Sequence, residues 1–184
     1  MIIPSIDLQE GQAVQLVGGR NKALDAGDPH PLIRRFGRVG EVAVIDLDAA
    51  LGRGSNAGLV RELLPLARCR VGGGIRDART ALDWLDAGAE QVILGTAATP
   101  EVLRQLPRDR IIAALDAEHG EVVTHGWRQR SGETIEKRLE RLAPFVGGFL
   151  ITFVEREGRL EGIDVESAAR LVQAAGDVKV TVAG

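Results

Sequence analysis

Two ten-residue segments of this chain resemble each other, and their spacing constrains the fold more than any other feature. The first is IIPSIDLQEG at residues 2–11, and the second is IIAALDAEHG at residues 111–120. In each, an apolar run stops at an aspartate, and these two aspartates, Asp7 and Asp116, are 109 positions apart (116 − 7). Self-similarity at a fixed offset indicates a chain built from two related halves.

The similarity continues beyond these segments, at offsets that change slightly as loops lengthen or shorten. VIDLDAALGRGSN at 44–56 resembles LITFVEREGRLEGID at 150–164, with Gly54 against Gly162 and Asn56 against Asp164. RVGGGI at 70–75 resembles TVAG at 181–184. The repeat therefore covers most of both halves.

Between the repeated motifs, short β-branched runs alternate with helical patterns. The runs are continuously apolar, which is typical of parallel strands covered on both faces. The predicted strands are Ile2–Asp7, Val42–Asp48, Cys69–Gly72, Gln91–Gly95, Ile111–Asp116, Gly148–Phe153 and Val178–Val182. The predicted helices are Pro31–Val39, Ala57–Ala67, Ala78–Ala87, Pro100–Gln105, Thr134–Phe145 and Val165–Ala175. The fold class is therefore α/β.

The repeat favours a closed (β/α)8 TIM barrel with two-fold pseudo-symmetry over an open doubly wound sheet. In this interpretation residues 1–184 form a single domain, with a first half-barrel over 1–108 and an incomplete second half over 109–184. The dinucleotide-binding motif G-x-G-x-x-G does not follow the first strand. When the second half is aligned with the first on RVGGGI, the chain ends at Gly184, partway through the second copy of this motif. The chain is therefore expected to be truncated after its seventh strand. Such a form should have unpaired sheet edges and little or no activity.

Composition excludes several classes of function. A hydrophobic fraction of 45% and a charged fraction of 27% are ordinary for a globular domain, and a net charge of −3 argues against general nucleic-acid binding. No apolar stretch reaches the roughly 20 residues of a membrane helix, so a cytoplasmic protein without a membrane partner is expected. The lone Cys69 is expected to be buried, and the three histidines lack metal-ligand spacing.

The two aspartates are the leading candidates for chemistry. Residues at the carboxyl ends of barrel strands form the active site, and strands one and five of a pseudo-symmetric barrel face each other. A pair of opposed carboxylates can divide the roles of general acid and general base. The alternative is that Asp7 and Asp116 each form an Asx-turn with the following loop. Their equivalent positions in the repeat favour catalysis.

Glycine-rich loops follow the predicted strands three and four. Backbone N–H groups in such loops, together with a helix N-terminus, can bind a phosphate, although tight turns are the simpler explanation. The candidate phosphate ligands are Gly73, Gly74, Arg76, Gly95 and Thr96. The repeat would build a second phosphate site from Ala183, Gly184 and the segment after them, which predicts a small-molecule substrate with two phosphates.

Four further residues are weaker candidates. Asp46 and Asp48 end the second predicted strand, either as polar groups at the barrel mouth or as partners of lysine and arginine. Trp127 lies in the polar segment THGWRQRSG and suits stacking on a planar ring. Thr152 ends strand six at the place that Asp46 holds in the first half, and can donate a hydrogen bond to a substrate or to the backbone. Trp84, by contrast, has the spacing of a core residue.

Seven motifs, in order along the chain, resemble the histidine-biosynthesis isomerase family, phosphoribosylformimino-5-aminoimidazole carboxamide ribotide isomerase (HisA). They are IIPSIDLQEGQAVQLVGG, GDP, VIDLDAALGRGSN, VGGGIR, ILGTAA, AALDAEHGEVVTHGW and VAG. The resemblance runs from end to end. It implies an Amadori rearrangement without metal or cofactor, of an aminoaldose bearing two phosphates to an aminoketose, in a full-length protein that is a monomer. By position, Asp7 would accept a proton, Asp116 would donate one, and Trp127 would stack on the heterocycle.

The chain departs from that family at two positions. Glu157 stands where the family usually has aspartate, and Phe153 stands where an acidic residue is usual. Two alternative functions stay open. One is a bifunctional isomerase that also converts phosphoribosylanthranilate, and the other is a non-catalytic phosphate-binding barrel fragment.

Overall fold

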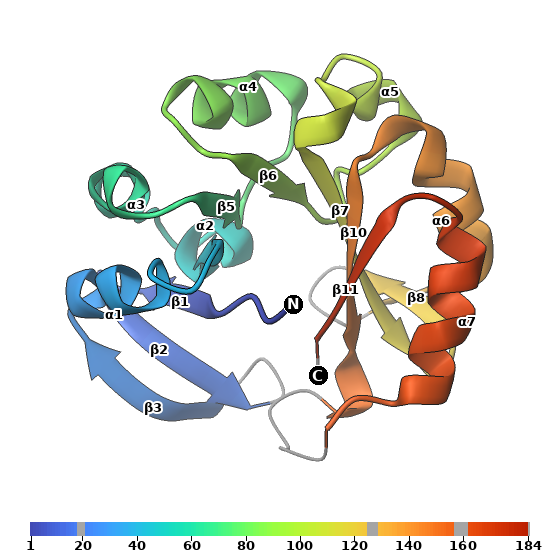
Figure 1. Ribbon diagram of the computed structural model, residues 1–184, viewed down its shortest axis with the longest axis horizontal. Coiled ribbons are helices and arrows are strands. Elements are labelled where there is room, and N and C mark those ends of the chain that lie inside the picture. Colours follow the sequence, from blue (N-terminus) through green and yellow to red (C-terminus); the bar gives the residue numbers. More distant parts are fainter. Residues whose placement is uncertain (18–20, 125–128, 157–161, 184) are drawn as a thin grey trace. The chain divides into compact units, whose positions relative to one another are not determined.

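The computed structural model describes residues 1–17, 21–124, 129–156 and 162–183. The chain divides into two compact units (Figure 1). Unit 1 comprises Met1–Leu16 and Lys22–Ile93, and unit 2 comprises Val17–Asn21 and Leu94–Gly184. Each unit has parallel strands joined by helices, which confirms the α/β class. In the described part of the chain, no helix is both long and apolar enough to cross a membrane.

Unit 1 is built on a sheet in which the parallel strands lie at the centre. Its strands are β1 (Ser5–Gln9), β2 (Gln12–Val17), β3 (Asn21–Gly27), β4 (Val42–Asp46), β5 (Cys69–Gly72) and β6 (Gln91–Leu94). Their order is β6-β5-β4-β1-β2-β3, and β2 pairs antiparallel with β1. Val42, Val44 and Val71 are almost fully buried, as expected for strands covered on both faces.

Three of the four α-helices of unit 1 begin at a capping aspartate. They are α1 (Pro29–Phe36), α2 (Leu47–Leu51), α3 (Ala57–Leu63) and α4 (Ala78–Asp86), and a 3₁₀ turn at Leu64–Leu66 follows α3. Asp28 caps α1, Asp46 caps α2 and Asp77 caps α4, each through a hydrogen bond to a backbone N–H of the first turn. Such bonds satisfy donors that a helix cannot pair internally.

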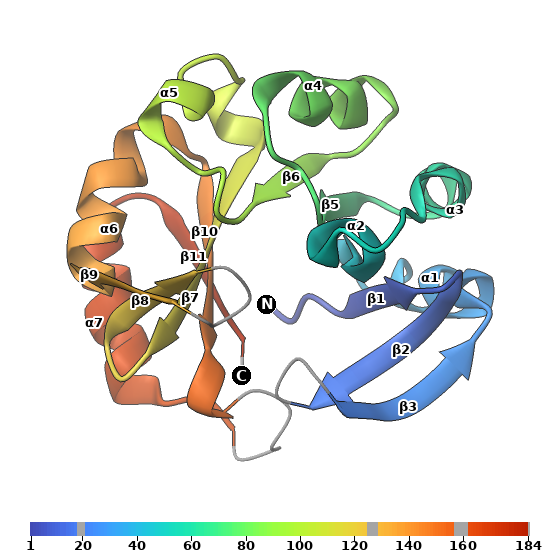
Figure 2. The same cartoon turned by 180° about the vertical axis from the view of Figure 1, so that it is seen from behind.

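Unit 2 repeats the arrangement, again with an antiparallel hairpin after its first strand. Its strands are β7 (Ile111–Glu118), β8 (Glu121–Thr124), β9 (Gln129–Thr134), β10 (Gly148–Phe153) and β11 (Lys179–Ala183). Its helices are α5 (Pro100–Leu103), α6 (Ile135–Leu142) and α7 (Val165–Ala175), with 3₁₀ turns at Arg108–Arg110, Ala143–Phe145 and Val154–Arg156. The strands β7, β10 and β11 are parallel, and α6 and α7 lie side by side on one face of them (Figures 1 and 2).

The predicted boundaries of three elements are confirmed to the residue: Cys69–Gly72, Gly148–Phe153 and Val165–Ala175. The prediction that Asp7 and Asp116 end their strands is wrong, because β1 continues to Gln9 and β7 to Glu118. Each strand then enters an antiparallel hairpin that the sequence reading missed. The turns are Glu10–Gly11 and His119–Gly120, and all four residues have positive φ, as type I′ hairpin turns require.

The register of the paired strands shows which residues of the two halves correspond, and it corrects two predictions. Asp7 pairs with Ile45 of β4, and Asp116 pairs with Thr152 of β10. Thr152 is therefore the counterpart of Ile45, and the counterpart of Asp46 is Phe153. Two residues further along, Asp48 corresponds to Glu155. Asp48 itself lies in the first turn of α2 and not in a strand.

Candidate active site

Asp7 occupies the centre of β1, with β4 on one side and β2 on the other. It pairs with Ile45 and Val14 in the two ladders, and the hydroxyl of Ser5 donates a hydrogen bond to its Oδ1 at 2.9 Å. Burial raises the pKa of Asp7, and the Ser5 hydrogen bond only partly opposes this shift. The strand continues past Asp7, so the Asx-turn alternative is not what the structure shows. A carboxyl group with a raised pKa suits proton transfer near neutral pH.

The raised pKa predicts that Asp7 destabilises the folded protein at neutral pH. The folded protein holds the Asp7 proton more tightly than the unfolded chain does, so stability is lost as pH rises through the folded-state pKa. Asp7→Asn cannot ionise, and is therefore expected to raise the free energy of unfolding at pH 7 and to lose this advantage as pH falls toward 4. Urea denaturation across that pH range measures the difference, with Asp83→Asn on the exposed side of α4 as control. A pH-independent difference for Asp7→Asn would contradict the prediction.

A buried polar cluster follows β4 and consists of Asp46, Asp48 and Asn56, whose exposed fractions are 2%, 8% and 7%. The Asn56 Nδ2 donates to Asp46 Oδ1 at 2.8 Å and to Asp48 Oδ2 at 2.9 Å. The Asn56 backbone N–H donates to Asp46 Oδ2 at 2.7 Å. One amide side chain thus satisfies two carboxylates that lie too deep for water to solvate them.

The same cluster fixes the turn of the β1–β2 hairpin. The backbone N–H of Glu10 donates to Asp48 Oδ2 at 2.6 Å, and that of Gly11 donates to Asn56 Oδ1 at 2.8 Å. The hydrogen bonds of Asp46 and Asp48 come from backbone N–H groups, Ser55 and Asn56. These partners differ from the lysine and arginine side chains offered as one alternative above, and give both aspartates a structural role.

Removing the Asn56 amide should destabilise unit 1 strongly. Asn56→Ala leaves two buried carboxylates short of a donor and one backbone N–H short of an acceptor, and each such loss costs about 1–3 kcal/mol. We expect a total loss of about 3 kcal/mol in the free energy of unfolding at pH 7, measured by urea denaturation. Ser55→Ala is the control, since Ser55 Oγ donates to the same cluster only over a 3.4 Å contact with Asp46, and its other bond, from the Ala57 N–H at 3.1 Å, is exposed. A loss no larger than that of the control would contradict a structural role.

The glycine loop after β5 approaches the cluster so closely that no side chain fits. A Cβ on Gly73, whose φ is 96°, would lie 2.2 Å from the Asp46 carbonyl oxygen. A Cβ on Gly74, at φ 70°, would lie 2.6 Å from Cβ of Ala49. Arg76 is exposed, and its Nη2 is 3.5 Å from the carbonyl oxygen of Ala49. Packing therefore accounts for Gly73 and Gly74, while phosphate binding by this loop remains a prediction.

In unit 2 the structure brings four predicted residues together around β7. Asp116 lines a pocket of about 70 Å³ with Gly95 and Thr96, and pairs in register with Thr152. Asp116 is half-buried, whereas Gly95 and Thr96 are exposed. A carboxyl group next to an exposed glycine loop can meet an anionic substrate and exchange a proton with it.

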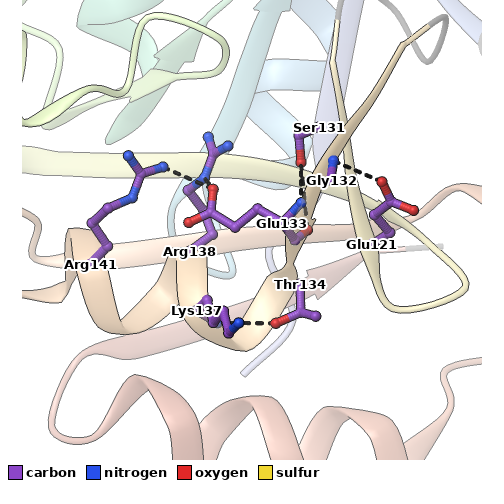
Figure 3. Close-up of polar contacts among 8 residues, drawn as sticks. All are labelled: Glu121, Ser131, Gly132, Glu133, Thr134, Lys137, Arg138 and Arg141. Carbon is purple, nitrogen blue, oxygen red and sulfur yellow. Dashed lines mark hydrogen bonds and ion pairs between the residues drawn. The ribbon is translucent and has the colours of Figure 1, made fainter.

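Arg138 lines the same pocket and was not among the predicted site residues. Its Nε donates to Glu133 Oε2 at 2.5 Å, and Arg141 donates to the same oxygen at 2.9 Å (Figure 3). Thr134 caps α6 by accepting from the Lys137 N–H at 3.5 Å. The charged residues of α6 have the spacing of an ordinary solvent-facing side of a helix. No sequence signal therefore indicates that Arg138, rather than Arg141, lines a pocket.

Three predicted site residues, Trp127, Glu157 and Gly184, lie outside the described residues. The two predicted core residues are where the sequence placed them. Trp84 is 8% exposed and lies beneath the Arg61 guanidinium, 5.0 Å from the ring centroid. Cys69 is buried, and burial raises the pKa of its thiol to about 11, which disfavours the nucleophilic thiolate.

Comparison with known proteins places the whole chain in one family. A family model described as "Histidine biosynthesis protein" matches residues 1–184. A relative from Haloarcula marismortui is 37% identical over 100% of this chain and 80% of its own length. Relatives from Myxococcus xanthus and Natronomonas pharaonis are 40% and 38% identical, over 89% and 100% of this chain and 74% and 81% of their own lengths. All three are named 1-(5-phosphoribosyl)-5-((5-phosphoribosylamino)methylideneamino) imidazole-4-carboxamide isomerase. The chain belongs to the histidine biosynthesis protein family.

Proposed function

We propose that this chain is an isomerase of histidine biosynthesis that acts on the aminoaldose named in its relatives. The observation that carries the proposal is the position of Asp116, which lines one pocket with Gly95 and Thr96 and pairs with Thr152. The relatives share 37–40% identity with the chain, and their printed names describe isomerases whose substrates carry two phosphoribosyl groups. No observation favours the bifunctional enzyme or the non-catalytic fragment.

The proposed reaction is an Amadori rearrangement by general acid and general base catalysis. Asp116 donates a proton to the ribose ring oxygen, the ring C1–O bond breaks, and the amine nitrogen forms a C=N bond to C1. Asp7 then removes the proton from C2, which gives an enolamine whose tautomerisation produces the ketone at C2. The raised pKa of Asp7 brings its proton affinity toward the range that such a base needs.

The remaining predicted residues take binding roles in this proposal. Gly73, Gly74, Arg76, Gly95 and Thr96 bind one phosphate, while Trp127 stacks on the imidazole and Gly184 belongs to the second phosphate site. Thr152 donates a hydrogen bond to the substrate beside Asp116. Asp46 and Asp48 act on the substrate only indirectly, because they hold the hairpin turn, and Glu157 serves in place of the family's aspartate.

The direct test is to incubate the purified chain with the aminoaldose and to follow formation of the aminoketose by absorbance and mass spectrometry. A parallel incubation with phosphoribosylanthranilate separates the single-substrate enzyme from the bifunctional one. Turnover of the first compound alone supports the proposal, and turnover of both supports the bifunctional enzyme. Tight binding of the aminoaldose without any turnover would instead support a non-catalytic phosphate-binding protein.

A further inference from the structure

A pocket of about 220 Å³ in unit 2 has no role in the mechanism above. It lies where the β7–β8 turn, the end of β10 and the start of α7 meet, and its walls include His119, Gly120, Phe153, Glu155, Asp164 and Arg170. Sites for whole drug-sized ligands measure roughly 300–1,000 Å³. This pocket is therefore sized for one end of a longer molecule or for a small ring.

The first half of the repeat shows what occupies the corresponding place in unit 1. The turn Glu10–Gly11 corresponds to His119–Gly120, Asp48 corresponds to Glu155 by strand register, and Asn56 corresponds to Asp164. In unit 1 these residues close around the Asn56 side chain. A primary carboxamide, that of Asn56, fills the place that is open in unit 2.

Each polar atom of the Asn56 carboxamide has a partner that recurs in the second half. Its NH₂ group donates to Asp48 at 2.9 Å, and its oxygen accepts from the Gly11 N–H at 2.8 Å. The Glu10 N–H completes the arrangement with a 2.6 Å hydrogen bond to Asp48. The NH₂ group of Asn56 also donates to Asp46 at 2.8 Å, but the counterpart of Asp46 in unit 2 is Phe153. The part of this amide receptor that recurs is therefore one carboxylate and the two turn N–H groups.

Unit 2 retains this recurring part of the receptor but lacks the amide. Asp164 cannot donate from its side chain, and its two oxygens instead accept from the backbone N–H and hydroxyl of Ser167, at 3.0 and 2.8 Å, as the cap of α7. Glu155 Oε2 is buried and has no hydrogen-bond partner among the described residues. The turn residues His119 and Gly120 are exposed, and within the same described part of the chain no backbone acceptor is seen for their N–H groups, which are therefore accessible to a ligand. A buried acceptor without a donor is costly, so a donor from a ligand is the expected complement.

We propose that this pocket binds a primary carboxamide, with the ligand NH₂ donating to Glu155 Oε2 and the ligand C=O accepting from the Gly120 N–H. A phosphate or carboxylate fits less well, because Glu155, Asp164 and Glu136 all line the pocket. The two arginines there have other partners, since Arg156 donates to the Gly162 carbonyl and Arg170 donates to Ser167. The walls therefore select a neutral group that has both a donor and an acceptor.

The substrate of the proposed reaction carries a primary carboxamide. The assignment of this pocket to the substrate therefore rests on the proposed function. The relatives are named for an imidazole-4-carboxamide substrate. His119 lies three residues beyond Asp116 along the same chain segment, roughly 10 Å at 3.3 Å per strand residue. A substrate whose sugar reaches Asp116 can therefore extend its carboxamide end toward the pocket.

The binding test uses imidazole-4-carboxamide and, as a matched anion, imidazole-4-carboxylate, each titrated by calorimetry. We expect the carboxamide to bind with a millimolar Kd and the carboxylate at least about tenfold more weakly. Glu155→Ala should weaken carboxamide binding about tenfold or more, whereas Glu166→Ala on α7, outside the pocket walls, should leave it unchanged. Equal binding of the two probes, or an unchanged carboxamide affinity in Glu155→Ala protein of normal melting temperature, overturns the proposal.

A kinetic test separates the substrate from an independent effector as the source of the carboxamide. If the substrate supplies it, Glu155→Ala raises KM for the aminoaldose about tenfold at nearly constant kcat, and imidazole-4-carboxamide inhibits competitively. Inhibition that depends on Glu155 but is not competitive assigns the pocket to a separate carboxamide ligand. Glu155-dependent binding in a protein without turnover supports the pocket and refutes the proposed function. Normal turnover, together with carboxamide binding that does not depend on Glu155, supports the proposed function and refutes the assignment of the pocket.

Discussion

Asp116→Asn is expected to lower kcat for the aminoaldose by about 10²–10⁴-fold, the usual contribution of a positioned general acid or base. Asparagine has nearly the shape of aspartate and can still fill its place on β7, so the pocket with Gly95 and Thr96 should survive. It cannot release a proton to the ribose ring oxygen. Binding of the aminoaldose, measured by calorimetry, should therefore change much less than kcat.

Two further variants make this result specific. Asp7→Asn should cause a loss of similar size, because the base removes the C2 proton in a separate step. Glu118→Gln, two residues beyond Asp116 on β7, is the matched control and should retain turnover within a few-fold. If both aspartate variants keep wild-type kcat, neither carboxylate takes part in the chemistry and the isomerase mechanism fails.

The parallel strands could be predicted because their burial shows directly in the sequence. Val42, Val44 and Val71 lie in short, continuously apolar runs, which are typical of strands in a sheet covered on both faces, and all three are buried. The hairpins could not be predicted in the same way. Their turns use Glu10–Gly11 and His119–Gly120, which lack the Asn-Gly and Asp-Gly signals typical of such turns.

The roles of the aspartates after β4 depend on contacts that sequence order does not show. Asp46 was predicted to be either a polar group at the barrel mouth or a partner of lysine and arginine. Its carboxylate instead caps α2 and accepts from Asn56, 10 residues along the chain. Glu155 was not predicted as a site residue. It differs in type from its counterpart, Asp48, and the two are 107 positions apart (155 − 48), whereas Asp7 and Asp116 are 109 apart. Only strand register aligns the two residues.

The exchange of Asn56 for Asp164 between the halves shows how a one-atom change alters a site. Both residues precede a helix at the same point of the repeat, and both types are good N-cap residues. Asn56 uses its NH₂ group to bind two carboxylates and leaves α3 without a side-chain cap, whereas Asp164 caps α7. The NH₂ donor that binds two carboxylates in unit 1 is therefore absent beside Glu155 in unit 2.

Gly73→Ala is expected to be the most destabilising substitution in unit 1, with a loss of about 3 kcal/mol or more in the free energy of unfolding. The new Cβ would lie 2.2 Å from the Asp46 carbonyl oxygen and 2.7 Å from the Asp46 backbone nitrogen. Backbone atoms cannot rotate away, so β4 and the loop after β5 must separate. That movement also disturbs the Asp46 side chain, which caps α2 and binds Asn56.

The matched control is Gly88→Ala, at φ 106° with no heavy atom within 4 Å of its Cβ. It carries the cost of positive φ alone, roughly 1–2 kcal/mol. Urea denaturation of the two variants at pH 7 gives the difference, which measures the close approach of the glycine loop to β4. If the glycine loop could move away from β4 without a cost in free energy, Gly73→Ala and Gly88→Ala would lower the free energy of unfolding equally. A larger loss for Gly73→Ala, together with normal phosphate affinity in the protein that remains folded, would show that Gly73 is required for packing and not for binding the substrate.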